Sequence, residues 1–385
     1  MTPIRVLVVM PLATALGGGE EMLRQLLRNS RKLEAGSRKA EAGSREVEWT
    51  VVFLRAGPMV EEARALGHDA HVIEAGRFRE VGRRLRAVRR IAELAHERGV
   101  DLVLGWMVAG QVMAGAAAWL ARMPCAWYQV GTPRPDWLDR VGTLLPARGV
   151  LVLSRTGAEG QARVWPRRRQ WLVHPGVALD AFDPARLPSP RDARRALGLE
   201  PDRPLVGMVT RLQRWKGVHV FVEALAALRR ERSDVRGVVV GGAHETEPAY
   251  PAELDAQVRA LGLEDVIRFA GHQSPVGPWM QAMDVVVHAS DREPFGIVLI
   301  EAMALGKPVV AGAEGGPAEI ITDGVNGLLA PYGDATALAR SIGRYLDDPG
   351  FAARVGAAAR ARAPEFSDRA YAAKVVAALR EIVAS

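Results

Sequence analysis

The chain has 385 residues, of which 49% are apolar and 25% are charged, so it is long enough for two domains and has an ordinary globular composition. Its single cysteine, Cys125, excludes a disulfide framework and a cysteine metal cluster, and it fits a reducing, cytoplasmic setting. The net charge of +7 favours anionic partners, but no nucleic-acid-binding motif accompanies the basic residues, so we expect no nucleic acid partner.

The amino-terminal half alternates short apolar segments with helical patterns, which is typical of a parallel α/β sheet. Its first segment has the pattern of a core strand and not of a signal peptide, because no small-residue cleavage pattern follows it. Residues 34–47 form an imperfect tandem repeat, small and charged, which we interpret as a surface loop. The strands expected here are Ile4–Met10, Trp49–Leu54, Ala70–Ile73, Leu102–Trp106, Ala126–Val130 and Val150–Leu153.

Arginine is concentrated in two clusters. Residues 77–90 read RFREVGRRLRAVRR, and residues 167–169 are three consecutive arginines. The simplest interpretation is a solvated helix face. The alternative is a surface that contacts anionic membrane lipid or an anionic acceptor, which predicts a cytoplasmic protein with peripheral contact at the inner membrane face through 77–90.

One uncharged stretch, residues 102–121, is just long enough to span a bilayer. Glycines interrupt it at regular intervals, and Gln111 lies in its middle. Its first residues have the pattern of a buried strand that leads into an alanine-rich helix. We therefore predict a strand and a helix here, not a membrane span.

Residues 174–190 are rich in proline, lack a clean period and are interpreted as a linker. The alternating pattern then resumes. We therefore expect two doubly wound parallel sheets in series, one in residues 1–175 and one in residues 176–365. The strands expected in the second half are Leu205–Thr210, Gly237–Val240, Ile267–Ala270, Val285–Ala289, Pro308–Ala311 and Gly327–Ala330.

Two strand-end segments carry residues suited to an anionic ligand. Gly17 and Gly18 follow the first strand, where glycines let backbone amides approach a ligand closely. Arg211 and Lys216 follow the first strand of the second half, and both are candidate phosphate ligands. A tight turn and two exposed cations explain these residues equally well.

The segment SDREPFGIVLIEAMALGKPVVAG, residues 290–312, contains two carboxylates around an apolar run. The pattern predicts a loop that holds Glu293, and a helix that begins near Gly296 or Ile297 and ends near Leu305. Glu301 then lies on the helix, roughly 7 Å further along.

The free amides at the start of this helix form an anion site between the two carboxylates. This arrangement suits a sugar nucleotide: Glu293 accepts from sugar hydroxyls, the amides hold the diphosphate, and Glu301 accepts from the ribose. Paired hydrolase carboxylates are the disfavoured alternative for the two residues. A purely structural carboxylate is the alternative for Glu301.

The same segment resembles the signature of retaining GT-B glycosyltransferases of family 4, also called glycosyl transferases group 1. Its mark is the Glu-x7-Glu pair, here Glu293 and Glu301. The resemblance extends over nearly the whole chain. The other matching segments are LGGGEEML at 16–23, VHPGVALDAF at 173–182, TRLQRWKG at 210–217 and EGGPAEIITDGVNGLLAP at 314–331.

The resemblance implies a GT-B fold, with an acceptor-binding domain and a nucleotide-sugar-binding domain, both Rossmann-like, that face a central cleft. It also implies that a C-terminal helix, about 366–385, packs back on the first domain. The implied reaction moves a sugar from a nucleotide-diphosphate-sugar donor, UDP- or GDP-linked, to an acceptor hydroxyl with retention of anomeric configuration. The implied acceptor is a sugar, a lipid-linked molecule or a small molecule, in glycan, glycolipid or polysaccharide biosynthesis.

Roles also follow from the resemblance, residue by residue. Catalytic roles fall on Glu293, Arg211, Lys216 and Gln129. Donor-binding roles fall on Gly17, Gly18, Arg211, Lys216, His272, Gln273, Glu293, Phe295, Gly296, Ile297, Val298 and Glu301. No cofactor is implied, and the chain contains no Asp-x-Asp metal motif, so a metal-independent hexosyltransferase is expected.

The chain departs from the family at one position, because Gln129 stands where many members carry a histidine. A glutamine can hydrogen-bond a sugar hydroxyl, but its amide cannot take up or release a proton as a histidine does. This motivates an alternative function, a catalytically weak nucleotide-sugar-binding subunit. A sugar-nucleotide epimerase on the same fold is a further alternative. His174 and His288 are expected to be structural.

Overall fold

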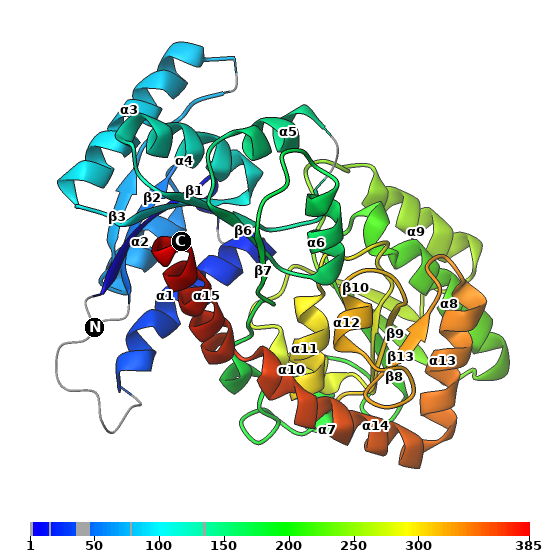
Figure 1. Cartoon of the computed structure of the whole chain (residues 1–385). Helices are drawn as coiled ribbons and strands as arrows, with labels where there is room; N and C mark the ends of the chain where they lie inside the picture. Colours follow the sequence, from blue (N-terminus) through cyan, green and yellow to red (C-terminus); the bar gives the residue numbers. More distant parts are fainter. Residues whose placement is uncertain (1–2, 15–16, 36–46, 78, 134–135) are drawn as a thin grey trace. The chain divides into compact units, whose positions relative to one another are not determined.

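The structure is a computed structural model, and it describes residues 3–14, 17–35, 47–77, 79–133 and 136–385. Most of the tandem repeat predicted at 34–47 lies outside the described residues. The chain divides into two compact units (Figure 1). Unit 1 comprises Met1–Gly176 and Asp368–Ser385, and unit 2 comprises Val177–Ser367.

Unit 1 is built on a parallel seven-stranded sheet of order β3-β2-β1-β4-β5-β6-β7. Its central strands are continuous apolar runs, buried on both faces because helices cover both sides (Figure 1). The strands are β1 (Ile4–Met10), β2 (Val47–Phe53), β3 (Asp69–Val72), β4 (Leu102–Trp106), β5 (Cys125–Gln129), β6 (Gly149–Val152) and β7 (Gln170–Leu172). The helices are α1 (Gly18–Ala35), α2 (Pro58–Ala65), α3 (Val81–Glu97), α4 (Met107–Ala121), α5 (Trp137–Leu144), α6 (Arg155–Ala162) and α15 (Asp368–Ala384).

Unit 2 repeats this design with a parallel six-stranded sheet of order β10-β9-β8-β11-β12-β13. The strands are β8 (Leu205–Val209), β9 (Arg236–Val240), β10 (Ile267–Gly271), β11 (Val285–His288), β12 (Val309–Gly312) and β13 (Leu328–Ala330). The α-helices are α7 (Pro190–Ala196), α8 (Val218–Glu231), α9 (Tyr250–Ala260), α10 (Gly277–Ala282), α11 (Ile297–Ala304), α12 (Pro317–Ile320), α13 (Ala335–Asp347) and α14 (Pro349–Arg362), and the short 3-10 turns are η1 (Leu179–Phe182), η2 (Arg214–Lys216) and η3 (Ala363–Phe366).

The uncharged stretch 102–121 is a strand followed by a helix, as its pattern predicts. The chain turns at Met107, which has a positive φ of 58°, and α4 begins there. Gln111, in the middle of the stretch, is completely buried inside unit 1. Among the residues that the structure describes, no helix is both long and apolar enough to cross a membrane.

Each strand expected from the sequence is present, with ends that shift by at most two residues. One strand was not expected, β7, which has only three residues and follows the arginines at 167–169. A short edge strand that is not fully buried has no apolar pattern to identify it. The first segment of unit 1 ends at Gly176, one residue beyond the expected boundary. The final helix begins at Asp368 instead of about residue 366.

Helix α15 closes unit 1 against α1. Its Tyr371 is buried, with its ring centroid 6.4 Å from that of Tyr128 in β5. At the other end of the helix, Arg148 donates to the carbonyl oxygens of Ile382 and Val383, at 3.3 and 3.1 Å. A guanidinium on the last carbonyls is favourable because it satisfies acceptors that have no partner within the helix.

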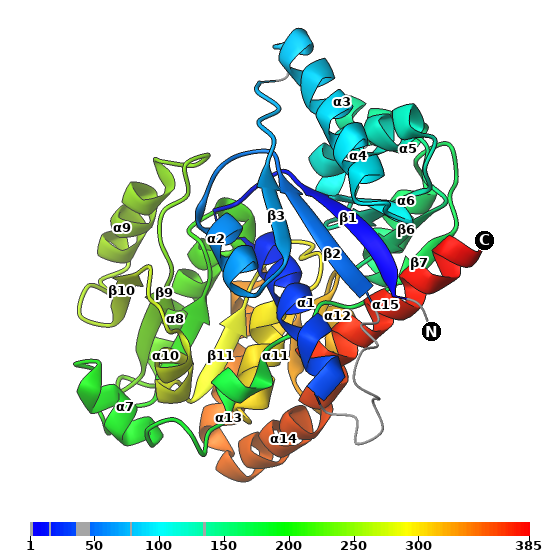
Figure 2. The same cartoon turned by 90° about the vertical axis from the view of Figure 1, so that its left-hand side faces the viewer.

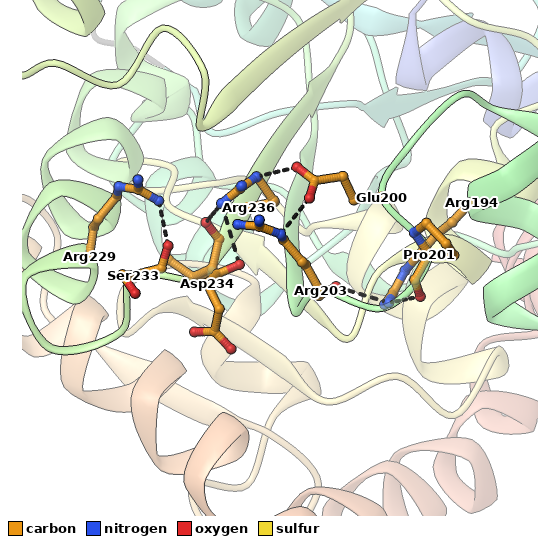
Figure 3. Close-up of polar contacts among 9 residues, drawn as sticks. Arg194, Glu200, Pro201, Arg203, Arg229, Ser233, Asp234 and Arg236 are labelled. Carbon is orange, nitrogen blue, oxygen red and sulfur yellow. Dashed lines mark hydrogen bonds and ion pairs between the residues drawn. The ribbon is translucent and has the colours of Figure 1, made fainter.

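A buried arginine ties together the amino-terminal edge of the unit 2 sheet (Figure 3). Arg194 in α7 donates to the carbonyl oxygens of Ala282, Pro201 and Arg203 at 2.7, 3.1 and 3.0 Å. It also forms an ion pair of 2.7 Å with Asp284, which accepts the Leu205 backbone N–H at the start of β8. One side chain therefore satisfies four acceptors at the entry to β8 and β11.

We predict that Arg194→Met destabilises the protein by about 2–4 kcal/mol, chiefly because it leaves three carbonyl acceptors without their donor, and also because it removes the partner of the partly exposed Asp284 carboxylate. Arg203→Met is the matched control. Arg203 pairs with Glu200 at the exposed edge of the same region, so its loss should cost at most about 1 kcal/mol. Thermal unfolding of both variants measures the difference, and equal losses would contradict the role of Arg194.

Candidate functional site

The carboxyl edge of the unit 2 sheet brings two predicted segments together. In parallel α/β sheets, ligands bind beyond the carboxyl ends of the strands. Strands β8 and β11 are neighbours, so the loop after β8 and the loop after β11 leave the sheet side by side. The Asp291 backbone N–H donates to the Trp215 carbonyl oxygen at 2.7 Å and joins the two loops.

An ion pair between Lys216 and Glu293 lies at the centre of this arrangement. The Lys216 Nζ donates to Glu293 Oε2 at 2.6 Å, and the two side chains are only 13% and 12% exposed. The ammonium also lies 4.0 Å from the centroid of the Trp215 ring, a cation–π contact. Two opposite charges with little access to water stabilise each other more than an exposed pair does, but each is costly once its partner is removed.

His288, the last residue of β11, makes a second contact with the same carboxylate. Its Nε2 lies 3.3 Å from Glu293 Oε2 and 3.5 Å from Ser290 Oγ. The side chain is 5% exposed, and its Nδ1 is buried without a hydrogen-bond partner. Both contacts reach Oε2, so they fix the orientation of the carboxylate.

These contacts also set the protonation state of Glu293. Burial by itself raises the pKa of the carboxyl, but the adjacent Lys216 ammonium and the hydrogen bond from His288 outweigh burial and hold the pKa well below its usual range. Glu293 is therefore a carboxylate at neutral pH. It accepts hydrogen bonds and is unsuited to the role of general acid.

Close backbone packing makes this geometry possible. Gly217, directly after Lys216, has a φ of +72°, and a Cβ there would lie 2.0 Å from the Ala289 carbonyl oxygen. No other residue type fits without a shift of backbone. On the other side, the Gly316 backbone N–H donates to the Glu293 carbonyl oxygen at 2.8 Å. The site loop is therefore held between two glycine-containing segments.

Helix α11 begins next to Glu293 with an N-terminus that no side chain caps. Its N-cap is Gly296, with a φ of +105°. The Leu299 N–H bonds back to the Gly296 carbonyl oxygen at 3.0 Å, so the N–H groups of Ile297 and Val298 precede the first turn's hydrogen bond. The buried Phe295 ring packs on Phe366, with centroids 5.8 Å apart, and anchors the helix start. Such a terminus favours an anion.

The remaining predicted residues of unit 2 lie along the same edge. Glu301 is half-buried in the second turn of α11. Arg211 is exposed in the loop after β8, and its guanidinium forms no ion pair with any described residue. His272 is exposed after β10, while the Gln273 amide donates to the Ala270 carbonyl oxygen at 2.7 Å. Two strand spacings, about 10 Å, separate β10 from β8.

Three predicted residues belong to unit 1. Gly17 and Gly18 lie at the start of α1, where the buried Glu20 carboxylate accepts from Thr14 Oγ1 at 2.8 Å. Gln129 ends β5, and its Nε2 donates to Asp139 Oδ1 at 3.0 Å, with both side chains buried. The Gln129 amide nitrogen is therefore already held by Asp139 of α5. Its contact with a sugar stays a prediction.

Sequence reasoning did not identify His288 as part of the site, and it gave no role to Trp215. Nothing in the local sequence singled them out, because His288 ends an apolar strand and Trp215 lies beside a predicted phosphate ligand. The signal that was available is the position of His288 at the carboxyl end of a strand directly before the site loop. Of the predicted residues, Lys216 and Glu293 are in direct contact, through their ion pair.

Comparisons with known proteins place the chain among glycosyltransferase relatives. Residues 190–362 match the family model described as Glycosyl transferases group 1. The D-inositol 3-phosphate glycosyltransferase of Xylanimonas cellulosilytica is 41% identical over 234 residues, 58% of this chain and 54% of that protein. The protein of the same name from Streptomyces scabiei is 40% identical over 205 residues, 51% of this chain and 45% of its own. The chain thus spans about half the length of the curated relatives it matches.

Solved structures resemble the whole chain. Anabaena Alr3699/HepE in complex with UDP and glucose is 26% identical, with a TM-score of 0.84 over 98% of this chain and 100% of that one. Sucrose-phosphate synthase from Thermosynechococcus elongatus is 24% identical, with a TM-score of 0.75 over all of both chains, and shows the fold alone. Together these findings confirm the predicted α/β class with two Rossmann-like domains, and they support a group 1 glycosyltransferase.

The ion pair gives a pH-dependent prediction. Because the folded-state pKa of Glu293 is lowered, its contribution to stability is complete above the unfolded value of about 4.3 and is lost as the pH falls below it. We expect Glu293→Gln to cost about 3–5 kcal/mol at pH 7, since it leaves a buried ammonium unpaired. The difference from the unsubstituted protein should narrow below about pH 4.

Thermal unfolding at pH 7, 5 and 3.5 measures this difference. Glu200→Gln is the control, because Glu200 is an ion-paired carboxylate that is 48% exposed, and its loss should cost at most about 1 kcal/mol. A penalty for Glu293→Gln that stays constant across the pH range would contradict the assigned charge state.

Proposed function

We propose that the protein is a retaining glycosyltransferase of family 4 that transfers a sugar from a nucleotide-diphosphate-sugar to an acceptor hydroxyl. The observation that carries this proposal is the Lys216–Glu293 pair at the carboxyl edge of unit 2, next to the uncapped start of α11. A cation, a carboxylate and free amides at one edge are the groups that a sugar diphosphate requires. The group 1 family match over residues 190–362 supports the same activity.

The donor is proposed to lie along the carboxyl edge of the unit 2 sheet. The diphosphate is proposed to accept hydrogen bonds from the Val298 amide, the Lys216 ammonium and the exposed Arg211 guanidinium. The transferred sugar is proposed to contact the Glu293 carboxylate and the amides of Phe295, Gly296 and Ile297. The ribose takes Glu301, and the base lies against His272 and Gln273. Gly17 and Gly18, in unit 1, are proposed as donor-binding residues on the family resemblance alone. The complexes of Anabaena Alr3699/HepE with UDP and with UDP-glucose support a UDP-sugar donor.

In the proposed reaction, a new bond forms between the acceptor oxygen and the anomeric carbon, while the bond from that carbon to the diphosphate oxygen breaks. The acceptor approaches from the face that the diphosphate leaves, so the configuration is retained. The acceptor proton passes to an oxygen of the departing diphosphate. Glu293 stays ionised and stabilises the positive charge that develops on the sugar, and Gln129 orients a sugar hydroxyl.

Positive charge on the diphosphate side is needed in the transition state, because negative charge accumulates on the leaving group. We propose that Arg211, Lys216 and the α11 dipole supply it, which makes the reaction metal-independent. The absence of an Asp-x-Asp motif from the sequence supports this assignment.

The acceptor is proposed to be a polyol or sugar hydroxyl in glycan, glycolipid or polysaccharide synthesis. The relatives named D-inositol 3-phosphate glycosyltransferase make D-inositol 3-phosphate the first acceptor to assay. The alternative of a nucleotide-sugar-binding subunit is motivated by Gln129. An epimerase on the same fold would use the same donor contacts.

The test incubates the protein with UDP-glucose, or with GDP-mannose, and follows the sugar by NMR. We expect slow release or transfer of the sugar, with the α-anomer as the first product. Lys216→Ala and Glu293→Ala should lower the rate by about 10²–10³-fold, the usual cost of losing one transition-state contact. Arg211→Ala, an exposed substitution that spares the fold, should lower it by at least tenfold.

Lys374→Ala removes an exposed lysine of α15 and should leave the rate unchanged. Tight donor binding without turnover on any acceptor would instead indicate the binding subunit. Conversion of the sugar while it stays attached to UDP would indicate the epimerase. Inversion at the anomeric carbon would contradict the retaining mechanism.

We also propose that the protein contacts anionic membrane peripherally through the 77–90 segment, of which residue 78 lies outside the described residues. At the start of α3, Val81 and Leu85 are 62% and 59% exposed, with exposed arginines around them. Apolar side chains in a basic surface favour the interface of an anionic bilayer.

The expected result is that vesicles with phosphatidylglycerol pellet the protein at low salt, less so in 0.5 M salt, and that Leu85→Glu weakens pelleting. Leu120→Glu is the control, because Leu120 is 48% exposed on α4 outside this segment. A protein that stays in the supernatant at low salt would contradict membrane contact.

A further inference from the structure

A hydrogen-bonded contact between α8 and α9 lies directly after the turn that carries Lys216. The two helices pack against each other in unit 2, and Figure 2 shows both near β9 and β10. Tyr250, the first residue of α9, is 2% exposed. His219, the second residue of α8, is partly buried, and the two ring centroids are 6.2 Å apart. None of the contacts assigned to the donor involves either side chain.

The Tyr250 hydroxyl bonds to two groups of His219. It accepts the His219 backbone N–H at 3.2 Å, and it lies 2.8 Å from His219 Nδ1. The single hydroxyl proton therefore goes to Nδ1, which has to be an acceptor, so the neutral imidazole carries its own proton on Nε2. The first backbone N–H groups of a helix have no partner within it, and the N-cap residue of α8, Gly217, has no side chain to bond them. Tyr250 supplies this cap instead.

The same part of the fold holds the turn η2 at both ends. At the far end, Lys216 immediately precedes Gly217, the residue from which the capped helix begins. At the near end, the Arg214 backbone N–H donates to Glu247 Oε2 at 2.9 Å, and the Arg214 guanidinium pairs with Glu253 of α9. Helix α9 and the loop before it therefore fix the position of η2 relative to the sheet.

We propose that Tyr250 and His219 are positioning residues that hold the Lys216 ammonium in place for Glu293 and for the donor diphosphate. The ammonium donates to Glu293 at 2.6 Å, and hydrogen bonds weaken steeply as their geometry is lost, so a small shift of η2 disturbs the pair. Tyr250 and His219 act through the turn and not on the donor itself. The inference rests on the proposed donor binding and adds two residues to that same site.

The bond to Nδ1 also makes this arrangement sensitive to pH. Burial lowers the pKa of His219, the Glu223 carboxylate opposes this effect, and the Arg214 guanidinium adds to it. The imidazole is therefore neutral at pH 7 and accepts from Tyr250. As the pH falls, a proton on Nδ1 removes that acceptor and the bond is lost. Other titratable or charged groups on the surrounding elements are Glu247, Glu253 and Tyr332, and on α13 Arg344, which stacks on Phe351, and Asp347, which pairs with Arg232 at the end of α8.

Calorimetry with UDP-glucose measures the positioning effect on the full chain. We expect Tyr250→Phe to weaken binding about three- to tenfold at pH 7.5, the effect of losing one hydrogen bond. Tyr345→Phe is the matched control, because Tyr345 is also 2% exposed and its hydroxyl donates to the Val309 carbonyl oxygen at 3.2 Å. This variant loses the same kind of bond at the amino end of β12, so its affinity should change less than twofold.

His219→Asn tests the pH dependence, because an asparagine oxygen can replace Nδ1 as the acceptor but does not titrate. We expect its affinity at pH 7.5 to stay within twofold of the unsubstituted protein. Between pH 7.5 and pH 5, the unsubstituted protein should lose at least threefold more affinity than His219→Asn. His272 and His288 are present in both proteins, and the diphosphate of UDP-glucose keeps its charge in this range, so the difference reports His219.

Equal effects of Tyr250→Phe and Tyr345→Phe, or the same pH dependence in His219→Asn as in the unsubstituted protein, would overturn the proposal. Hydrogen–deuterium exchange of residues 213–219 without ligand separates this inference from the proposed function. If the protein binds no nucleotide sugar, the proposed function fails. Faster exchange of the Lys216 amide in Tyr250→Phe but not in Tyr345→Phe then still supports the positioning role, and equal exchange in both variants contradicts it.

Discussion

The buried pair of Lys216 and Glu293 is the constraint around which unit 2 is arranged. A charge in a site with little water is stable only beside its partner, so the loops after β8 and β11 have to meet. The glycine after Lys216 and the backbone bond from Gly316 serve this requirement, because each lets a segment approach the site loop closely. His288 adds a second contact to the same oxygen of Glu293 and fixes the orientation of the carboxylate.

The two edges of the unit 2 sheet have different roles: the amino edge is structural, and the carboxyl edge offers groups to a ligand. At the amino edge, Arg194 and Asp284 satisfy backbone groups at the strand entries. Lys307 donates to the Gln281 carbonyl oxygen there, and burial lowers its pKa to about 8, an effect that the Asp284 carboxylate opposes. These charged groups are all engaged in contacts within unit 2. At the carboxyl edge, the exposed Arg211 guanidinium and the uncapped N–H groups at the start of α11 are hydrogen-bond donors that a ligand can use.

Much of the fold could be predicted because parallel strands buried on both faces are continuous apolar runs, such as Ile4–Met10 and Leu102–Trp106. The three-residue β7 lacks such a run and was missed. The helix that starts at Ile297 was predicted because Gly296 and Gly306 delimit it. The Glu-x7-Glu spacing selected both carboxylates, but it could not show that the first of them is paired with a lysine 77 residues earlier in the chain.

The sequence by itself determined the α/β class, the two-domain order and the residue types at the strand ends, because periodicity and turn residues act over short distances along the chain. Only the tertiary structure decided which of those residues meet. Strand order places β8 beside β11 and so brings Lys216 to Glu293, which His288 also contacts. It also places β9 between β8 and β10, which sets α8 beside α9 and brings His219 to Tyr250. Contacts of this kind depend on sheet topology, which local patterns do not contain.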